Sequence, residues 1–238
     1  LSLKVQSFFE KINLRRAHAI IVSSQYAKGK VVNLYKIEPN KIAIISNGFD
    51  LDSWEKDLAK QEVENRPKKR ILAVAKFYPR KKIEVLVKAF AILSKIKKDV
   101  ELFLVGDGVE LPRLQELASE LGIKNSVTFF GNISGREKMA CMYKNCDIFC
   151  HTSVQENFPN VLLEAMASFK PIVAARAASM PEIVKDGVTG LLFNANDSED
   201  LAQKLLELLN NNLMSSKMGE EGYKLLINNY LWKNQVQK

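Results

Sequence analysis

From residue 70 onward, short apolar runs alternate with longer segments in which apolar residues recur every three or four positions. Such runs predict strands buried on both faces, and the helical spacing predicts amphipathic helices that cover them. The predicted strands are 71–75, 100–105, 127–130, 148–150, 172–174 and 190–193. The predicted helices are 81–97, 109–121, 134–145, 159–169, 181–184 (one turn) and 198–210. The pattern predicts an α/β fold: a Rossmann-like parallel sheet with helices on both faces.

The first part of the chain predicts a separate, smaller set of elements. They are a helix over 5–18, a strand over 19–22, a helix over 25–35 with a serine N-cap, and a strand over 41–46. Residues 55–70 are polar and charged and contain Pro67, as a linker often does. We therefore predict a first unit at 1–54, a linker at 55–69, the Rossmann-like domain at 70–213 and C-terminal helices at 214–238.

Three unusual stretches follow predicted strands, namely 76–82, 106–108 and 152–160. In parallel sheets, ligands bind beyond the carboxyl ends of the strands, where the strand order reverses. The first stretch holds four cations in seven residues, which suits a diphosphate, although a solvated basic loop remains the alternative. Gly106 and Gly108 lack the third glycine of a dinucleotide fingerprint. They predict a tight turn that lets a ligand pass close to the backbone.

The third stretch leads into a helix that carries two acids eight residues apart. Pro159 suits the first turn of a helix, so Glu156 should lie in the loop before it and Glu164 inside it. The helix start can hold an anion, and the flanking carboxylates would bind hydroxyls of an attached sugar or ribose. The two acids could instead form an acid and base pair, as in glycosidases, and Glu164 could be an exposed helix charge.

The remaining candidates are weaker. His151 follows a strand at the ligand edge, where Glu156 could tune it as a base, but packing within the loop explains it equally well. Gly131 and Asn132 could offer backbone hydrogen bonds to a flat base or form a simple turn. The three cysteines have no zinc spacing and suit a reducing compartment, and Cys150 should be a core residue.

The net charge adds one constraint. It is +8, from 35 Lys and Arg against 27 Asp and Glu, which favours an anionic partner or simply a soluble surface. No apolar run reaches the roughly 20 residues of a membrane-spanning helix. The start lacks the order of a signal peptide, and its first residue, Leu1, suggests a fragment of a longer protein.

The ordered motifs resemble retaining glycosyltransferases of family 4 (glycosyl transferases group 1), which have the GT-B fold. The segment from Glu156 to Ala167 resembles their E-x7-E motif, and 45–50 resembles the segment that joins their two domains. Further resembling stretches are 71–86, 105–108, 127–131 and 181–192. The resemblance covers about residues 15–235. It implies a C-terminal, donor-binding domain, with residues 1–54 as the remnant of the N-terminal, acceptor-side domain.

The resemblance also implies a role for each residue. Lys76 and Lys81 would neutralise the diphosphate of a nucleoside-diphosphate sugar, without a metal ion or a cofactor. Glu156 would bind hydroxyls of the transferred sugar, and Glu164 those of the ribose. Gly106 would let the donor approach, and the backbone at Ile133 would contact the base. The backbone of four consecutive residues would hold phosphate or sugar: Asn157, Phe158, Pro159 and Asn160. The Phe158 side chain itself should pack in the core.

The sequence departs from the family pattern at several positions. Lys76 replaces the usual Arg, Lys82 replaces a Gly, and Ala178-Ser179 replaces Gly-Gly. By this resemblance, most of the acceptor-side domain, which carries a catalytic His in this family, is expected to lie outside residues 1–238, and His18 does not occupy that position. We therefore expect no catalytic side chain here beyond the leaving-group lysines, and little or no turnover by the isolated chain. The expected reaction is hexosyl transfer to an unknown acceptor, which could be a glycan, a lipid or a protein-linked oligosaccharide.

Three other functions are kept as alternatives. The first is a non-catalytic nucleotide-sugar-binding module or subunit. The second is a nucleic-acid-binding protein, which ranks low because the cation runs 68–70, 80–82 and 95–98 contain few aromatic residues. A nicotinamide dehydrogenase ranks lower still. We expect no nucleic-acid partner and a cytoplasmic location, and we leave peripheral association with the cytoplasmic membrane face open.

Overall fold

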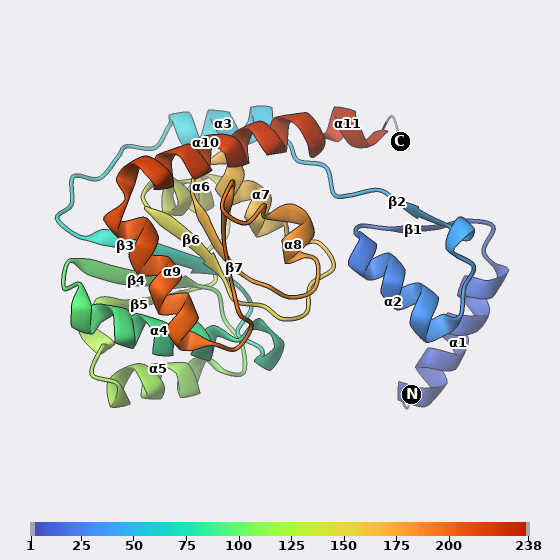
Figure 1. The fold of residues 1–238 in the computed structure, drawn as a ribbon, viewed down its shortest axis with the longest axis horizontal. Helices are drawn as coiled ribbons and strands as arrows, with labels where there is room; N and C mark the ends of the chain where they lie inside the picture. Colours follow the sequence, from blue (N-terminus) through green and yellow to red (C-terminus); the bar gives the residue numbers. More distant parts are fainter. Residues whose placement is uncertain (1–2, 237–238) are drawn as a thin grey trace.

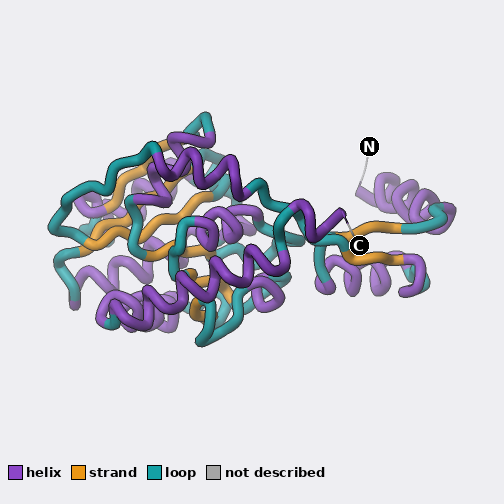
Figure 2. The backbone as a smooth tube through the Cα atoms, turned by 90° about the horizontal axis from the view of Figure 1, so that it is seen from above, coloured by secondary structure: helices purple, strands orange, loops and turns teal. Residues whose placement is uncertain are grey.

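The computed structural model describes residues 3–236, which form a small and a large unit joined by one extended segment (Figures 1 and 2). The small unit contains α1 (Leu3–Arg16), β1 (Ile20–Val22), α2 (Gln25–Tyr35), the 3-10 turn η1 (Pro39–Lys41) and β2 (Ile42–Ile44). β1 and β2 pair in parallel over a small core of Ile20, Ile37 and Ile42. As predicted, Ser24 caps α2, accepting from the Ala27 N–H at 3.1 Å.

The large unit is built on six parallel strands. They are β3 (Lys69–Val74), β4 (Val100–Val105), β5 (Val127–Gly131), β6 (Ile148–His151), β7 (Ile172–Ala175) and β8 (Gly190–Phe193). The connections are η2 (Pro79–Lys81), α4 (Ile83–Ile96), α5 (Leu111–Glu120), η3 (Lys124–Ser126), α6 (Arg136–Lys144), α7 (Asn160–Ala167), α8 (Met180–Ile183) and α9 (Ser198–Asn210). Helices α3 (Leu51–Ala59), α10 (Asn212–Asn229) and α11 (Trp232–Val236) complete the chain. The predicted Rossmann-like parallel sheet is thus confirmed.

Helices cover both faces of this sheet (Figure 1). Alternate residues along each strand point to opposite faces, so Ile71 and Ala73 join a core with α4, α5 and α9. Leu72 joins a second core with α3, α6, α7 and α10. The strand order is β5-β4-β3-β6-β7-β8, so the direction of winding reverses between β3 and β6. A ligand site is expected where the carboxyl ends of these two strands diverge.

The predicted boundary at residue 55 falls inside a helix. α3 begins at Leu51, capped by the Asp50 side chain, which accepts from the Ser53 N–H at 3.2 Å. Trp54 is 2% exposed, and its indole N–H donates to Ser168 Oγ at 3.0 Å. Asp57 is also buried, and it forms an ion pair with Arg136 at 2.5 Å. These contacts hold α3 on the large unit, so only the later part of 55–69 is extended.

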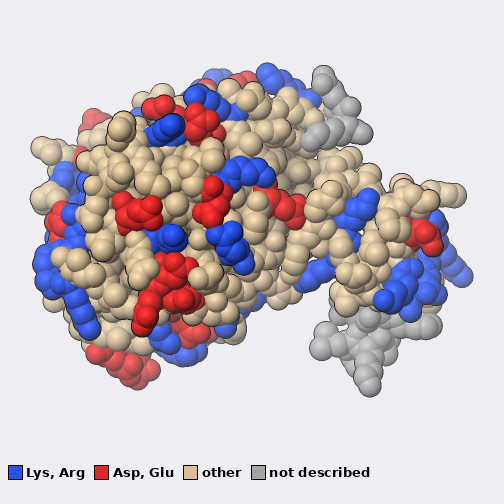
Figure 3. All heavy atoms as spheres, viewed as in Figure 1, with Lys and Arg blue, Asp and Glu red and all other residues tan. Residues whose placement is uncertain are grey.

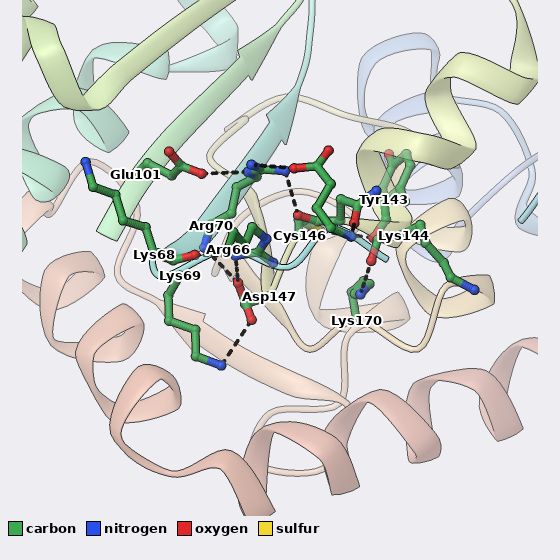
Figure 4. Close-up of polar contacts among 12 residues, drawn as sticks. Arg66, Lys68, Lys69, Arg70, Glu101, Tyr143, Lys144, Cys146, Asp147 and Lys170 are labelled. Atoms are coloured by element: carbon green, nitrogen blue, oxygen red, sulfur yellow. Dashed lines mark hydrogen bonds and ion pairs between the residues drawn. The ribbon is translucent and has the colours of Figure 1, made fainter. Parts of the chain in front are cut away.

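The extended part, residues 60–68, is fixed to the amino ends of β3 and β6 by polar contacts (Figure 4). The buried Arg70 guanidinium binds Glu101 at 2.9 Å and Glu64 at 3.0 Å, and lies 3.9 Å from the centre of the Phe103 ring. Asp147 accepts from the Arg70 backbone N–H at 2.7 Å and pairs with Arg66 and Lys69. The segment therefore behaves as part of the large unit.

The C-terminal helices return to the joint between the units (Figure 1). α10 packs on α7, and the chain then reaches the connecting segment, where the Phe49 N–H donates to Tyr230 O at 2.7 Å. A Cβ atom on Gly48 would lie 2.6 Å from the Trp232 ring, so glycine is required for this contact. The connecting segment is thus held by the end of the chain.

Candidate functional site

A cavity of about 480 Å³ opens where the strand order reverses. Its walls come from the ends of β3, β4 and β6, the segment after β5, and the start of α7. Nine of the ten residues predicted for the site line it, and they are Lys76, Lys81, Gly106, Ile133, Glu156, Phe158, Pro159, Asn160 and Glu164. The remaining lining residues are Val74, Ala75, Val105, Asn132, Met139, His151 and Val161. The structure therefore brings the separate motifs to one place.

One carboxylate oxygen is the centre of the polar side of the cavity. Glu156 Oε1 accepts a short hydrogen bond from Lys81 Nζ, and both side chains are largely buried, at 14% and 13% exposure. Arg80 Nη1 lies 3.6 Å from the same oxygen, and His151 Nε2 lies 3.8 Å from it. A cation pair beside an acid can bind both an anion and a hydroxyl group, as a phosphorylated sugar requires.

The two loops that carry these residues are tied together through the backbone. The Thr152 hydroxyl donates to Lys81 O at 2.7 Å, and the Val154 N–H donates to Arg80 O at 3.1 Å. The Ser153 hydroxyl also donates to Arg80 O, at 3.2 Å. Thr152 and Ser153 are buried, so these hydrogen bonds are shielded from water. The loop after β3 and the loop after β6 therefore hold Lys81 and Glu156 in fixed relative positions.

His151 is the last residue of β6 and is 3% exposed. Burial lowers the pKa of this histidine to about 4; the Glu156 charge raises it and the Lys81 charge lowers it further. The imidazole is therefore neutral at pH 7. The sequence considered His151 as a base tuned by Glu156, but desolvation outweighs the carboxylate. A group with so low a pKa is a weak base, so the structure favours another role.

Glu164 lies on the first turns of α7, as predicted, with its side chain at the cavity wall. Burial raises the pKa of this carboxyl, while a hydrogen bond from Tyr143 opposes the rise. The single proton of the Tyr143 hydroxyl is shared with Val161 O, which lies 3.2 Å away. A partly buried carboxylate at a cavity wall gains most from donors that a ligand brings, such as the hydroxyls of a ribose.

Asn160 is the first residue of α7, and Pro159 precedes it at the N-cap position rather than inside the first turn. The Asn160 side chain lines the cavity and accepts a hydrogen bond from Asn47 Nδ2 at 2.7 Å. Asn157 is the one predicted residue that does not line this cavity. It borders a second one, of about 580 Å³, against the small unit, because the loop turns outward there before Phe158 packs against Tyr230.

Gly106 gives the chain its turn at the end of β4. Its φ is +133°, and a Cβ atom at this position would lie 1.7 Å from Ala75 O. No other residue would allow the ends of β3 and β4 to approach so closely. Lys76 follows β3 and is exposed at the cavity, with no ion pair among the residues that the structure describes. It is free to meet an anionic ligand.

Two of the departures from the family pattern fall at left-handed backbone positions. Lys82 has φ +53° and lies between η2 and α4, next to Lys81. Ala178 has φ +51° and precedes α8. Glycine adopts this conformation readily, whereas other residues pay a steric cost. The left-handed backbone explains why the family pattern has glycine at these two positions. This chain adopts the same backbone with Lys82 and Ala178.

Other features of the described residues bear on cofactors and partners. In the part of the chain that the structure covers, no three His, Cys, Asp or Glu side chains are grouped so that they could hold a metal ion. Among residues 3–236, no helix combines the length and apolar content needed to cross a membrane. On the face shown in Figure 3, acidic side chains lie between the basic ones over the large unit. The three cysteines are free, and Cys150 is buried as expected.

The profile of the family described as glycosyl transferases group 1 matches residues 55–225, more than half of the chain. The chain belongs to this family. The match begins inside α3 and ends inside α10, so it includes all strands of the six-stranded sheet and all residues that line the cavity.

Individual glycosyltransferases show the same relationship. An uncharacterised glycosyltransferase of Methanocaldococcus jannaschii is 27% identical over 243 residues, covering 99% of this chain and 61% of that protein. The D-inositol 3-phosphate glycosyltransferase of Mycobacteroides abscessus is 33% identical over 198 residues, covering 81% of this chain and 44% of that protein. The structure of Anabaena HepE in complex with UDP and glucose has a TM-score of 0.87 at 22% identity, covering 99% and 66%. The chain spans only part of these proteins.

Proposed function

We propose that this chain is the donor-binding part of a retaining, metal-independent glycosyltransferase of family 4, which transfers a hexose from a nucleoside-diphosphate sugar. The observation that carries the proposal is the cavity where two lysines from the segment after β3 meet two glutamates, one from the loop after β6 and one from α7: Lys76, Lys81, Glu156 and Glu164. Cations suit the diphosphate, and carboxylates suit the hydroxyls on either side of it. The HepE structures in complex with UDP and with UDP-glucose support a uridine nucleotide as the first donor to test.

The two lysines would bind the leaving group, which is the nucleoside diphosphate. An ammonium group has three N–H donors, so Lys81 can keep its hydrogen bond to Glu156 and still donate to phosphate oxygens. Each charge-assisted hydrogen bond to the diphosphate contributes about 1.5–3 kcal/mol. Lys76 adds a second cation to the lining of the cavity. Together they would stabilise the negative charge that develops on the departing diphosphate.

The other residues position the donor. Glu156 would accept hydrogen bonds from the transferred sugar, and Glu164 from the ribose. The backbone around Ile133 would contact the base, and the start of α7 would face phosphate or sugar. Because the chain spans part of its relatives, we propose that the acceptor is bound by residues outside it and that residues 1–238 alone turn over little or no substrate. A cytoplasmic location and peripheral contact with the membrane belong to the same proposal.

A thermal-shift panel tests donor binding directly. Residues 1–238 are heated with UDP, GDP, ADP and their sugars, and each variant is compared with its own ligand-free midpoint. A ligand at 100 times its Kd adds about 2.7 kcal/mol of stability. For a protein of this size that is roughly 5–10 °C. Lys81→Ala and Glu164→Ala should lose most of this shift.

The matched controls are Lys95→Ala and Glu120→Ala. Both side chains are exposed on helices away from the cavity and have no ion pair among the described residues. They should keep the full shift. The assignment of the site is wrong if no nucleotide raises the wild-type midpoint, or if the cavity variants respond as strongly as the controls.

A further inference from the structure

His151 carries an unexplained polar atom. The residue is 3% exposed and borders the cavity, and its Nε2 is buried without a hydrogen-bond partner among the described residues. A buried polar atom without a partner costs about 1–3 kcal/mol. Such atoms are uncommon in folded proteins and call for an explanation, and one explanation is a partner that arrives with a ligand.

The nearest polar group is the carboxylate of Glu156. The distance from His151 Nε2 to Glu156 Oε1 is 3.8 Å, longer than the roughly 2.7–3.2 Å of an N–H···O hydrogen bond. Lys81 already donates to the same oxygen. His151 Nε2 and Glu156 Oε1 therefore lie close together without a hydrogen bond between them.

The protonation state of the imidazole decides whether His151 Nε2 donates or accepts a hydrogen bond. A neutral imidazole carries one proton, on either of its nitrogens. An unprotonated Nε2 would set two acceptors against each other, so the tautomer with the proton on Nε2 is favoured beside the carboxylate. Burial supports the neutral form, since it lowers the pKa of His151 to about 4. His151 Nε2 is thus a hydrogen-bond donor, and Glu156 Oε1 beside it is an acceptor.

We propose that His151 Nε2–H and Glu156 Oε1 together bind one hydroxyl group of the transferred sugar. A hydroxyl oxygen about 2.8 Å from both atoms would see them at an angle of about 85°, which suits one accepted and one donated hydrogen bond. A phosphate oxygen cannot donate to the carboxylate, and an ammonium group cannot accept from the imidazole. The hydroxyl belongs to the sugar because Lys81, on the same carboxylate oxygen, is the proposed diphosphate ligand. The inference rests on the proposed function.

Calorimetric titration of residues 1–238 separates the sugar from the nucleotide. The ligands are the nucleoside diphosphate that gives the largest thermal shift, its sugar nucleotide, and the sugar nucleotides that lack one hydroxyl each. The measured quantity is the ratio of the affinity for the sugar nucleotide to that for the nucleoside diphosphate. His151→Phe removes the donor, and His151→Gln replaces it with an amide N–H. His18→Phe, at the other histidine and in the small unit, is the matched control.

His151→Phe should lower the ratio about 5- to 20-fold while the affinity for the nucleoside diphosphate changes less than about 2-fold. His151→Gln should restore part of the ratio, and His18→Phe should leave it unchanged. In the wild type, one of the deoxy donors should lose at least as much affinity, because that deletion removes the hydrogen bonds to both His151 and Glu156. The same deletion should cost less in His151→Phe, where only the hydrogen bond to Glu156 remains to be lost.

Two results would overturn the inference and leave the proposed function standing. One is an unchanged ratio in His151→Phe with normal nucleotide binding. The other is a wild type that tolerates the loss of every hydroxyl, a measurement that does not depend on any variant being folded. Failure of all nucleotides to bind the wild type would instead overturn the proposed function, and the inference with it.

Discussion

The stability of this protein should fall between pH 6.5 and pH 4 because of His151. In the unfolded chain a histidine takes up a proton near pH 6.5, whereas in the fold the pKa of His151 is lowered to about 4 by burial. The unfolded state therefore binds more protons in this interval, and stability rises with pH through it. The pKa values of the unfolded and folded states differ by about 2.5, which corresponds to about 3 kcal/mol of unfolding free energy. This contribution is fully present above pH 6.5 and is lost as the pH falls to 4.

Urea denaturation of the wild type and of His151→Gln at pH 7, 6, 5 and 4.5 measures the contribution of His151 to the unfolding free energy. Carboxylates that titrate in both proteins largely cancel in the difference, including Asp147 and Asp186, whose pKa values are lowered in the fold. The difference in unfolding free energy should change by about 2–3 kcal/mol from pH 7 to pH 4.5. The chain has 2 histidines, so the NMR signal that disappears in the variant identifies His151, and its midpoint should lie near 4. A difference that is constant with pH would refute the burial argument.

Three further substitutions have defined outcomes. Arg70→Met should lower the unfolding free energy by about 3 kcal/mol, because it leaves two carboxylates without their buried partner. The control Lys68→Met, at an exposed side chain two residues away, should change it by less than about 0.5 kcal/mol, and urea denaturation measures both variants. Lys82→Gly should raise stability by about 0.5–1 kcal/mol in the same assay, since it relieves a left-handed residue at the entropic cost of a glycine, and a loss would show that the lysine side chain stabilises the loop. Glu164→Gln should stabilise the ligand-free protein at pH 7, because burial raises the pKa of this carboxyl and its ionised form costs stability. The same substitution should weaken nucleotide binding about 10-fold in calorimetry. A variant in which stability and nucleotide affinity both rise, or both fall, would contradict the reasoning.

Periodicity alone predicted most of the helices and strands of both units. The strand 100–105 and the helices 25–35 and 198–210 have the predicted bounds, because a buried strand or an amphipathic helix leaves an unambiguous pattern in the sequence. α3 was missed because its polar residues dominated the segment around it. Its apolar residues Leu51, Trp54 and Leu58 do have helical spacing. Its buried Asp57, in contrast, depends on Arg136 from a distant helix, which no local pattern reveals.

The site was predicted from motifs, and the structure adds distances. Sequence order placed Lys81 and Glu156 at the same sheet edge, but only the fold shows them hydrogen-bonded through a single oxygen. Asn157 was grouped with its neighbours because they are adjacent in sequence, yet it lines the cavity next to the small unit instead. The sequence placed Glu156 near His151, but the 3.8 Å distance between them and the burial of the imidazole depend on how the loop folds back over the strand end.

Asn160 takes part in two contacts at once, since it lines the cavity and also accepts from Asn47 of the connecting segment. The small unit has a second attachment nearby, where the Glu182 carboxylate accepts from the Gln25 and Tyr26 N–H groups at 2.8 and 2.7 Å. Any ligand that favours one arrangement of Asn160 therefore favours one arrangement of the joint, and the coupling is reciprocal. A second ligand that shifts the small unit would change the affinity of the cavity for its ligand. The cavity ligand would change the affinity for the second ligand by the same factor.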